Sequence, residues 1–279
     1  MGYKFGLIGY PIKHSLSPWI HKSLLQKAEL TGTYSLYEID LNASFADQIE
    51  KLRVEKLDGF NITVPYKQKI MPYLDKVDRQ AEAIGAVNTV VNKHGLWTGY
   101  NTDGVGYLRS LIEAYPEIGQ DKNKRFLIIG AGGAARAIIY TLFVNGFSNI
   151  DIANRTENAG HVLKSMYAMD QTTILSLKDA ERTMDRYDVI IQTTSVGMKP
   201  AAEDAIVTVN NVAKQTVVSD IVYQPVTTLL LRDAIAAGAS IHYGHKMLLY
   251  QAQYAFELWT GKRMEINEMD QELFEQLKG

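Results

Sequence analysis

The chain has 279 residues, of which 46% are hydrophobic and 22% are charged, and its formal net charge is −2 at pH 7. This composition is typical of a globular protein long enough for two domains, and the charge gives no general attraction to nucleic acid or anionic membrane. Cysteine is absent, which excludes disulfides, thiol catalysis and cysteine-ligated metals. No apolar run approaches membrane-spanning length, and no signal segment is recognisable. We therefore expect a cytoplasmic protein that binds neither nucleic acid nor membrane.

The first strand and helix of the chain are expected at residues 3–9 and 19–30. Ser15 and Ser17 stand between them, at the mouth of the helix, and Ser17 is the expected N-cap with Pro18 in the first helical position. Two hydroxyls at a helix N-terminus also make a site for a carboxylate. The residues alone leave both roles open.

Strands at 34–39 and 57–63, with a helix at 44–54 between them, continue an α/β pattern. The second of these strands runs into NITVPYK, so Asn61, Thr63 and Lys67 gather at its carboxyl end, where open α/β sheets bind ligands. A lysine at such a place is more often solvated than catalytic.

The next stretch predicts a helix at 78–84, a hairpin turning at 93–95 and a helix at 105–114. Asp103 precedes the last of these and is expected to cap it. The hydrophilic segment 115–124 indicates a loop at a domain boundary.

A dinucleotide-binding turn is indicated at Lys124 to Arg136, which reads KRFLIIGAGGAAR. The apolar run 126–129 does not alternate, which suits a strand buried on both faces. Gly130, Gly132 and Ala135 follow at the G-x-G-x-x-A spacing, and a helix is expected at 134–144. A pyrophosphate would sit on the free N–H groups at the N-terminus of that helix.

The following strand, 150–153, ends in Asn154, Arg155 and Thr156. An NAD-binding fold would place an acidic residue here for the ribose 2′-hydroxyl, and none is present. Arg155 instead offers a planar set of donors for a 2′-phosphate, which favours NADP over NAD, although a solvated arginine is the simpler alternative.

The last part of the chain predicts buried strands at 188–192 and 216–220, a helix at 228–237 and a long helix from Gly244 to about 260. A polar turn after the first of these strands is well placed to line a nicotinamide pocket. Gln251 is the polar member of an otherwise apolar stripe on the long helix. His242 and His245 straddle a turn and are expected to lack partners, and we find no metal-ligand cluster.

Together these segments resemble the shikimate dehydrogenase family (shikimate/quinate dehydrogenases) over nearly the whole chain. The resemblance implies an α/β protein of two lobes with the active site in the cleft between them. Residues 1–104, completed by helices in 239–279, would form the substrate-binding domain, and 105–238 the Rossmann-type NADP-binding domain. The motifs, in the family's order, are HSLSP (14–18), NITVPYK (61–67), GAVNT (85–89), YNTDG (100–104), GAGGAAR (130–136), NRT (154–156), TSVGM (194–198), DIVYQP (220–225) and the helix with Gly244 and Gln251.

The resemblance also implies an activity: reversible NADPH-dependent reduction of 3-dehydroshikimate to shikimate, on the route to chorismate and aromatic amino acids. Lys67 and Asp103 would be the catalytic pair, without a metal. The substrate-binding residues would be Ser15 and Ser17 for the carboxylate, Thr63, Asn88 and Gln251 for hydroxyls, and Tyr223 as the residue that closes the pocket. The cofactor-binding residues would be Gly130, Ala131, Gly132, Gly133, Ala134, Asn154, Arg155, Thr156, Thr194, Met198, Ile221 and Gly244. A homodimer is left open.

Three positions depart from the family's usual pattern. Ala159 stands where many relatives carry a second Lys or Arg, which implies a weaker preference for NADP; Gln192 replaces a common Asn, and Lys246 a small residue. The alternatives are a quinate/shikimate dehydrogenase with relaxed NAD/NADP use, a non-catalytic ligand sensor and a folate-linked dehydrogenase. The presence of Lys67 and Asp103 disfavours the sensor, and the paired serines suit a small carboxylate better than a folate.

Overall fold

The computed structural model describes residues 2–209 and 211–278, and the chain divides into two compact units. Unit 1 consists of the chain through Asp103 together with Leu249–Met269. Unit 2 consists of Gly104–Leu248 and the chain from Asp270. Each unit combines one six-stranded sheet with helices, so the α/β class predicted from the sequence is confirmed.

Unit 1 has a mixed sheet in the order β2-β1-β3-β5-β6-β4. β1 is parallel to β2 and β3, whereas β5 is antiparallel to β3 and β6. The ends of β1, β3 and β6 and the start of β5 therefore lie along one edge of the sheet. The strands are β1 (Tyr3–Gly9), β2 (Gly32–Glu38), β3 (Gly59–Ile62), β4 (Lys76–Val77), β5 (Thr89–Lys93) and β6 (Leu96–Tyr100).

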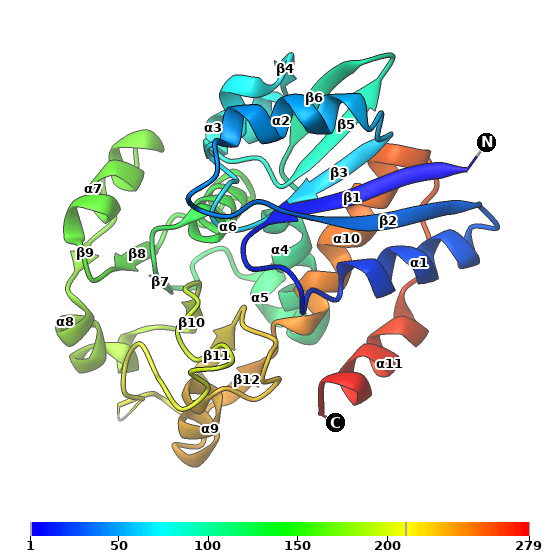
Figure 1. Ribbon diagram of the computed structural model, residues 1–279. Helices are drawn as coiled ribbons and strands as arrows, with labels where there is room; N and C mark the ends of the chain where they lie inside the picture. Colours follow the sequence, from blue (N-terminus) through cyan, green and yellow to red (C-terminus); the bar gives the residue numbers. More distant parts are fainter. Residues whose placement is uncertain (1, 210, 279) are drawn as a thin grey trace. The chain divides into compact units, whose positions relative to one another are not determined.

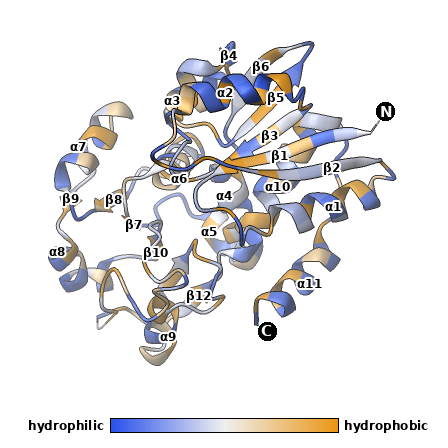
Figure 2. Cartoon of the chain, viewed as in Figure 1, coloured by the Kyte–Doolittle hydropathy of each residue, from blue (hydrophilic) through white to orange (hydrophobic). Residues whose placement is uncertain are grey.

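Helices cover both faces of this sheet, because alternate strand residues point to opposite sides. On one face Ile49 of α2 packs in a cluster with Phe60. On the other, Phe5 stacks on Trp259 of α10 with ring centroids 4.4 Å apart. Figure 1 shows α2 and α1 on opposite sides of β1, and Figure 2 shows apolar and polar residues interleaved along α2. The helices are α1 (Ser17–Lys27), α2 (Phe45–Val54), the 3₁₀ turn η1 (Met71–Tyr73), α3 (Arg79–Ile84) and most of α10 (His245–Thr260).

Unit 2 has an all-parallel sheet in the order β12-β11-β10-β7-β8-β9. This is the doubly wound Rossmann order, and the strand order reverses between β7 and β10. The predicted dinucleotide-binding fold is therefore present. The strands are β7 (Phe126–Ile129), β8 (Ile150–Ala153), β9 (Ile174–Leu175), β10 (Val189–Gln192), β11 (Val217–Asp220) and β12 (Ser240–His242).

The core of unit 2 lies on both faces of its sheet. Ile128 packs in a cluster with Ile138 of α6, while the next residue of β7, Ile129, packs in a cluster with Leu230 of α9. This two-sided burial explains why β7 has an unbroken apolar sequence. The helices are α4 (Asp103–Ala114), α5 (Pro116–Gln120), α6 (Gly133–Val144), α7 (Glu157–Met166), α8 (Leu177–Arg182), the 3₁₀ turn η2 (Met184–Arg186), α9 (Leu229–Ala236) and α11 (Asn267–Lys278).

Several local predictions are wrong, including the Asp103 cap, because Asp103 is itself the first residue of α4. Leu16, not Ser17, is the N-cap of α1, because Leu16 already has near-helical dihedral angles (φ −85°, ψ −4°) and the helix begins one residue early. The segment expected to be a loop contains α5, which buries Ile118. His242 and His245 do have partners: His242 Nδ1 lies 2.8 Å from the Ser219 hydroxyl, and His245 pairs with a carboxylate of α11.

Candidate active site

Lys67 and Asp103 form an ion pair within unit 1. Lys67 follows β3, Asp103 is the first residue of α4, and Lys67 Nζ donates to Asp103 Oδ2 at 2.6 Å. The side chains are only 17% and 6% exposed, so water screens the pair weakly. A cation held against a carboxylate in a partly enclosed site can stabilise a negative oxygen and pass a proton to it.

Asn88 fixes the orientation of Asp103. Asn88 Nδ2 donates to Asp103 Oδ1 at 2.9 Å, while Asn88 Oδ1 accepts from the Thr102 N–H at 2.9 Å. A backbone donor therefore determines which end of the Asn88 amide faces the carboxylate. Thr102 also donates to the backbone oxygen of Gln251 at 2.9 Å, which places α10 beside this network. Two of the residues expected to bind substrate hydroxyls, Asn88 and Gln251, thus lie beside the ion pair.

The two serines follow β1 and interact with each other. The Ser15 hydroxyl donates to Ser17 Oγ at 3.2 Å, and Ser15 Oγ accepts from the Ser17 N–H at 3.3 Å. Because Ser17 does not cap α1, both hydroxyls can turn toward a ligand. A carboxylate could accept one hydrogen bond from each of them.

Thr63 stands at the end of β3, beside the end of β1. Its methyl group occupies space next to Gly9, where a Cβ would lie 2.3 Å from Thr63 Cγ2. Gly9 therefore lets Thr63 sit at this position. The predicted substrate residues of unit 1 all fall on the same edge of its sheet or, in the case of Gln251, on α10.

Tyr34 and Thr89 received no role from the sequence, and Asn61 was placed at a ligand-binding strand end without a specific contact. The Tyr34 hydroxyl donates to Asn61 Oδ1 at 2.8 Å, and Asn61 Nδ2 donates to Thr89 Oγ1 at 3.1 Å. Its place in the NITVPYK motif put Asn61 near the site, and the structure adds its hydrogen-bond partners. Tyr34 gives no such signal, because an aromatic residue in a strand is ordinary.

The glycine turn of unit 2 has the features of a pyrophosphate site. Gly130 has φ +120°, and a Cβ there would lie 2.4 Å from Thr193 Oγ1, so only glycine fits. Gly132 is the N-cap of α6 without a side-chain cap, and a Cβ added there would meet nothing within 4 Å. The space beside Gly132 at the N-terminus of α6 is thus open, which fits the close approach of a dinucleotide. Ala131, Gly133 and Ala134 complete the turn.

The end of β8 provides the candidate site for the ribose. β8 lies beside β7 in the sheet, so its carboxyl end adjoins the glycine turn. Asn154 Nδ2 donates to the backbone oxygen of Thr156 at 2.9 Å and shapes the turn. Arg155 is exposed and its guanidinium can reach a phosphate in solvent. This arrangement fits the 2′-phosphate of NADP.

Gln192 and Asp220 connect the two loops expected near the nicotinamide. Gln192 Nε2 donates to Asp220 Oδ1 and to the backbone oxygen of Val196, each at 3.1 Å, and Gln192 Oε1 accepts from the Thr194 N–H. Asp220 Oδ1 also accepts from the Val222 N–H at 2.9 Å. The departure at Gln192 is thus accommodated by a hydrogen-bond network.

Other predicted residues of unit 2 lie on these loops and at the start of α10. Desolvation raises the pKa of Asp220 to about 6, although hydrogen bonds oppose the shift. Burial also raises the pKa of Tyr223. Met198 is 45% exposed, which is unusual for a large apolar side chain and suits contact with a ligand. Gly244 lies against Ile221, where a Cβ would be 2.5 Å from the Ile221 backbone oxygen.

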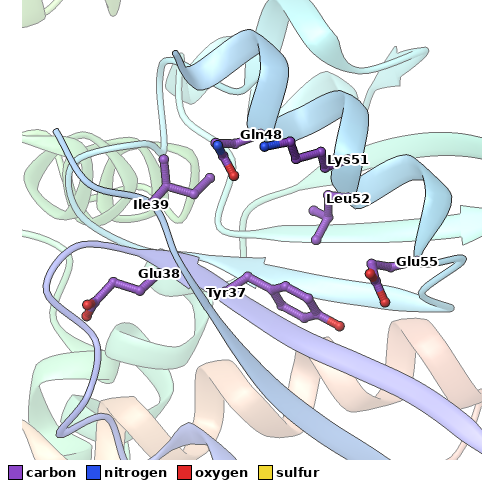
Figure 3. Close-up of a pocket in the computed structure, with 7 residues that line it drawn as sticks. All are labelled: Tyr37, Glu38, Ile39, Gln48, Lys51, Leu52 and Glu55. Carbon is purple, nitrogen blue, oxygen red and sulfur yellow. The ribbon is translucent and has the colours of Figure 1, made fainter. Parts of the chain in front are cut away.

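A separate surface pocket lies between the end of β2 and α2 (Figure 3). It contains none of the residues predicted to bind substrate or cofactor. Across residues 2–209 and 211–278, no group of His, Cys, Asp and Glu side chains is arranged to hold a metal, and no helix could cross a membrane. The pocket is lined by Tyr37, Glu38, Ile39, Gln48, Lys51, Leu52 and Glu55.

Comparison with known proteins agrees with these sites. Residues 7–90 match the shikimate dehydrogenase substrate binding domain, residues 113–224 match shikimate / quinate 5-dehydrogenase, and residues 244–274 match the shikimate 5′-dehydrogenase C-terminal domain. The shikimate dehydrogenase (NADP(+)) of Oceanobacillus iheyensis is 50% identical over 273 residues, covering 98% of each chain.

Solved structures of shikimate dehydrogenases share the fold. The Aquifex aeolicus enzyme superposes with a TM-score of 0.88 at 37% identity, covering 98% of this chain and 97% of that one. The Thermus thermophilus enzyme, solved with NADP(H) and shikimate, gives a TM-score of 0.86 at 29% identity and covers 99% of both chains. The family expected from the sequence motifs is confirmed, and the chain belongs to the shikimate dehydrogenase family.

Proposed function

We propose that this chain is an NADP-dependent shikimate dehydrogenase that reversibly reduces 3-dehydroshikimate to shikimate, in the pathway to chorismate and aromatic amino acids. The observation that carries the proposal is the Lys67–Asp103 pair, 2.6 Å apart and oriented by Asn88. The family relationship supports the same activity.

The chemistry of ketone reduction explains why this pair is suitable. Hydride arrives at the carbonyl carbon, so the oxygen gains negative charge and must take a proton. Lys67 stabilises that oxygen as an ammonium group and donates the proton; in the oxidation direction it accepts the proton from the hydroxyl. Asp103 holds Lys67 in place and shares the hydrogen bond of the substrate hydroxyl. NADPH, when bound, supplies the hydride.

The substrate would be held by the remaining polar residues. Ser15 and Ser17 donate to its carboxylate, in keeping with their paired hydroxyls. Thr63, Asn88 and Gln251 bind its hydroxyls, and Tyr223 closes the pocket. This set suits a small, polyhydroxylated ring acid better than a bulky or apolar ligand.

The cofactor would be held by the glycine turn and the end of β8. The open N-terminus of α6 takes the pyrophosphate, and Arg155 takes the 2′-phosphate. Ala159 offers no second cation, so we expect NADP to be preferred without NAD being excluded. Cytoplasmic location and a homodimer remain predictions.

Initial rates with shikimate and quinate, each with NADP and NAD, test the proposal. The highest kcat/KM is expected for shikimate with NADP. A higher kcat/KM for quinate would favour the quinate/shikimate alternative. Binding of shikimate without turnover by either cofactor would instead identify a ligand sensor and refute the proposed catalytic role.

A further inference from the structure

A continuous set of hydrogen bonds runs through unit 1 from β2 to Asp103. The Tyr34 hydroxyl donates to Asn61 Oδ1 at 2.8 Å, and Asn61 Nδ2 donates to Thr89 Oγ1 at 3.1 Å. Thr89 Oγ1 donates to Asn88 Oδ1 at 3.0 Å, and Asn88 Nδ2 donates to Asp103 Oδ1 at 2.9 Å. We call these five residues the Tyr34 chain.

The hydrogen bonds of the Tyr34 chain have defined directions. The backbone oxygen of Asn88 can only accept, and Asn61 Nδ2 donates to it at 3.2 Å, so Asn61 Oδ1 is left to face Tyr34. The Thr89 hydroxyl has a single proton and already accepts from Asn61, so it donates onward to Asn88 Oδ1. Asn88 Oδ1 accepts from both the Thr89 hydroxyl and the Thr102 N–H, so the amide presents Nδ2 to Asp103.

The start of the chain is held firmly by aromatic packing. The Tyr34 ring stacks on His21 at 4.5 Å between centroids and 6° between planes, and His21 packs on Trp259 at 4.9 Å. His21 is fully buried, and desolvation lowers its pKa to about 3, so the imidazole stays neutral under assay conditions. The Tyr34 hydroxyl is therefore fixed in position without a titrating neighbour in this stack.

Ser17 also interacts with the Tyr34 hydroxyl. Desolvation raises the pKa of Tyr34, and hydrogen bonding from Ser17 opposes that rise. When a carboxylate binds, the Ser17 proton turns to the anion, so its interaction with Tyr34 becomes dispensable. The bond from Tyr34 to Asn61 remains, because it does not involve the ligand.

We propose that Tyr34 is a positioning residue: acting through the Tyr34 chain, it holds the Asp103 carboxylate in the orientation that receives Lys67. Without the Tyr34 hydroxyl, Asn61 Oδ1 loses the donor at 2.8 Å in a residue that is only 5% exposed. A buried amide oxygen without a donor is unfavourable, so the Asn61 side chain rotates or a water molecule enters beside it. The change is transmitted through Thr89 and Asn88 to Asp103. The inference rests on the proposed function, because it concerns the same catalytic pair.

The test compares Tyr34→Phe with Tyr66→Phe. Tyr66 is a matched control: it is buried in unit 1, and its hydroxyl donates to the Ile39 backbone oxygen at 2.6 Å, outside the Tyr34 chain. Tyr34→Phe should lower kcat about 10-fold, as for the loss of one hydrogen bond in a charged network. Its shikimate dissociation constant, measured by calorimetry without cofactor, should change less than about twofold, because the proposal assigns the substrate carboxylate to Ser15 and Ser17 and gives Tyr34 no ligand contact. Both variants should lower the thermal midpoint similarly.

Three results would overturn the inference. Wild-type kcat in a folded Tyr34→Phe variant would show that the chain does not position the pair. A raised shikimate dissociation constant at unchanged kcat would make Tyr34 a binding residue. An equal loss of kcat in Tyr66→Phe would show that the loss in Tyr34→Phe results from general destabilisation of unit 1. A wild-type enzyme inactive with shikimate and NADP would refute the proposed function itself, which is a separate outcome.

A second pair of variants tests the chain if Tyr34→Phe does not fold. Thr89→Val removes the hydroxyl that passes the hydrogen bond onward, whereas Thr89→Ser keeps it. We expect kcat to fall in Thr89→Val and to stay close to the wild-type value in Thr89→Ser. Where Tyr34→Phe folds, its effect and that of Thr89→Val should not multiply in the double variant, because both break the same chain. Fully multiplicative effects, or equal turnover in the two Thr89 variants, would contradict the inference.

Discussion

Asp220 gives unit 2 a stability that depends on pH. Its side chain is 1% exposed, and the three groups that donate to it are neutral: the Thr228 hydroxyl at 2.7 Å, the Val222 N–H at 2.9 Å and Gln192 Nε2 at 3.1 Å. Desolvation outweighs these hydrogen bonds and raises the pKa of Asp220 from 3.8 to about 6. The folded state therefore binds this proton more tightly than the unfolded state does.

The sign and size of the effect follow from linkage. Between the unfolded and folded pKa values the native state holds more protons, so stability falls as pH rises and levels off above about pH 6. A shift of about two units corresponds to about 3 kcal/mol in total, of which about 2 kcal/mol falls between pH 4.5 and pH 8. The Asp220→Asn side chain cannot ionise, so this variant should not lose unfolding free energy as the pH rises. Its amide nitrogen would face the Thr228 hydroxyl, which can turn to accept.

Urea unfolding at pH 4.5, 6 and 8 measures the effect by circular dichroism. The free energy of unfolding of the wild type, minus that of Asp220→Asn, should fall by roughly 1–2 kcal/mol between the lowest and highest pH. Asp185→Asn, at an exposed position of unit 2, controls for the loss of one charge. The three tryptophans, Trp19, Trp97 and Trp259, lie in unit 1, so their fluorescence follows that unit separately. Parallel pH curves for wild type and Asp220→Asn would refute the reasoning.

Three further predictions concern the proposed substrate, cofactor and catalytic residues. Arg155→Ala should raise the KM for NADP and barely change that for NAD; equal increases would show that Arg155 does not recognise the 2′-phosphate. Ser15→Ala and Ser17→Ala should each weaken shikimate binding by ~1–3 kcal/mol in calorimetry, while an analogue without the carboxylate should be insensitive to both. Lys67→Ala should lower kcat by orders of magnitude with little change in KM, and combining it with Asp103→Asn should add little if the pair acts as one unit; near-normal turnover of folded Lys67→Ala would remove it from the mechanism.

The Rossmann unit could be predicted from local sequence because its signals are local. Phe126–Ile129 is buried on both faces, and such a strand needs an unbroken apolar run. Gly130 stands where φ is +120°, a conformation that selects glycine. Short elements carried no comparable signal: β12 has three residues, too few for a periodic pattern. It was therefore not predicted.

Side-chain partners that are distant in sequence could not be predicted. His242 meets a hydroxyl 23 residues away, and His245 meets the Asp270 carboxylate at 3.1 Å. The sequence predicts no partner for either histidine. The partner of Tyr34 could not be predicted either, because its acceptor Asn61 lies 27 residues along the chain.

The candidate active site was predicted in part. The local sequence places Lys67 at the carboxyl end of a strand, which is a general ligand-binding position, but it does not select a partner for that lysine. Asp103 is 36 residues away; local sequence predicts that it caps a helix, which is wrong, because it is the first residue of α4 and its carboxylate pairs with Lys67 and Asn88. Only the resemblance to a family paired the two residues. The structure brings them within 2.6 Å and so supplies the geometry that local reasoning lacked.

Physical cost argues that this pair is kept for function rather than for stability. Burying two charges requires removing water from both, and a well-packed apolar pair of similar volume is often as stable or more stable. Lys67 and Asp103 are nevertheless 17% and 6% exposed, and Asn88 is committed to the remaining oxygen of the carboxylate. A fold that needed only a core at this edge of the sheet would gain little from such a network. A reaction that creates negative charge on an oxygen needs a preorganised cation, and this arrangement provides one.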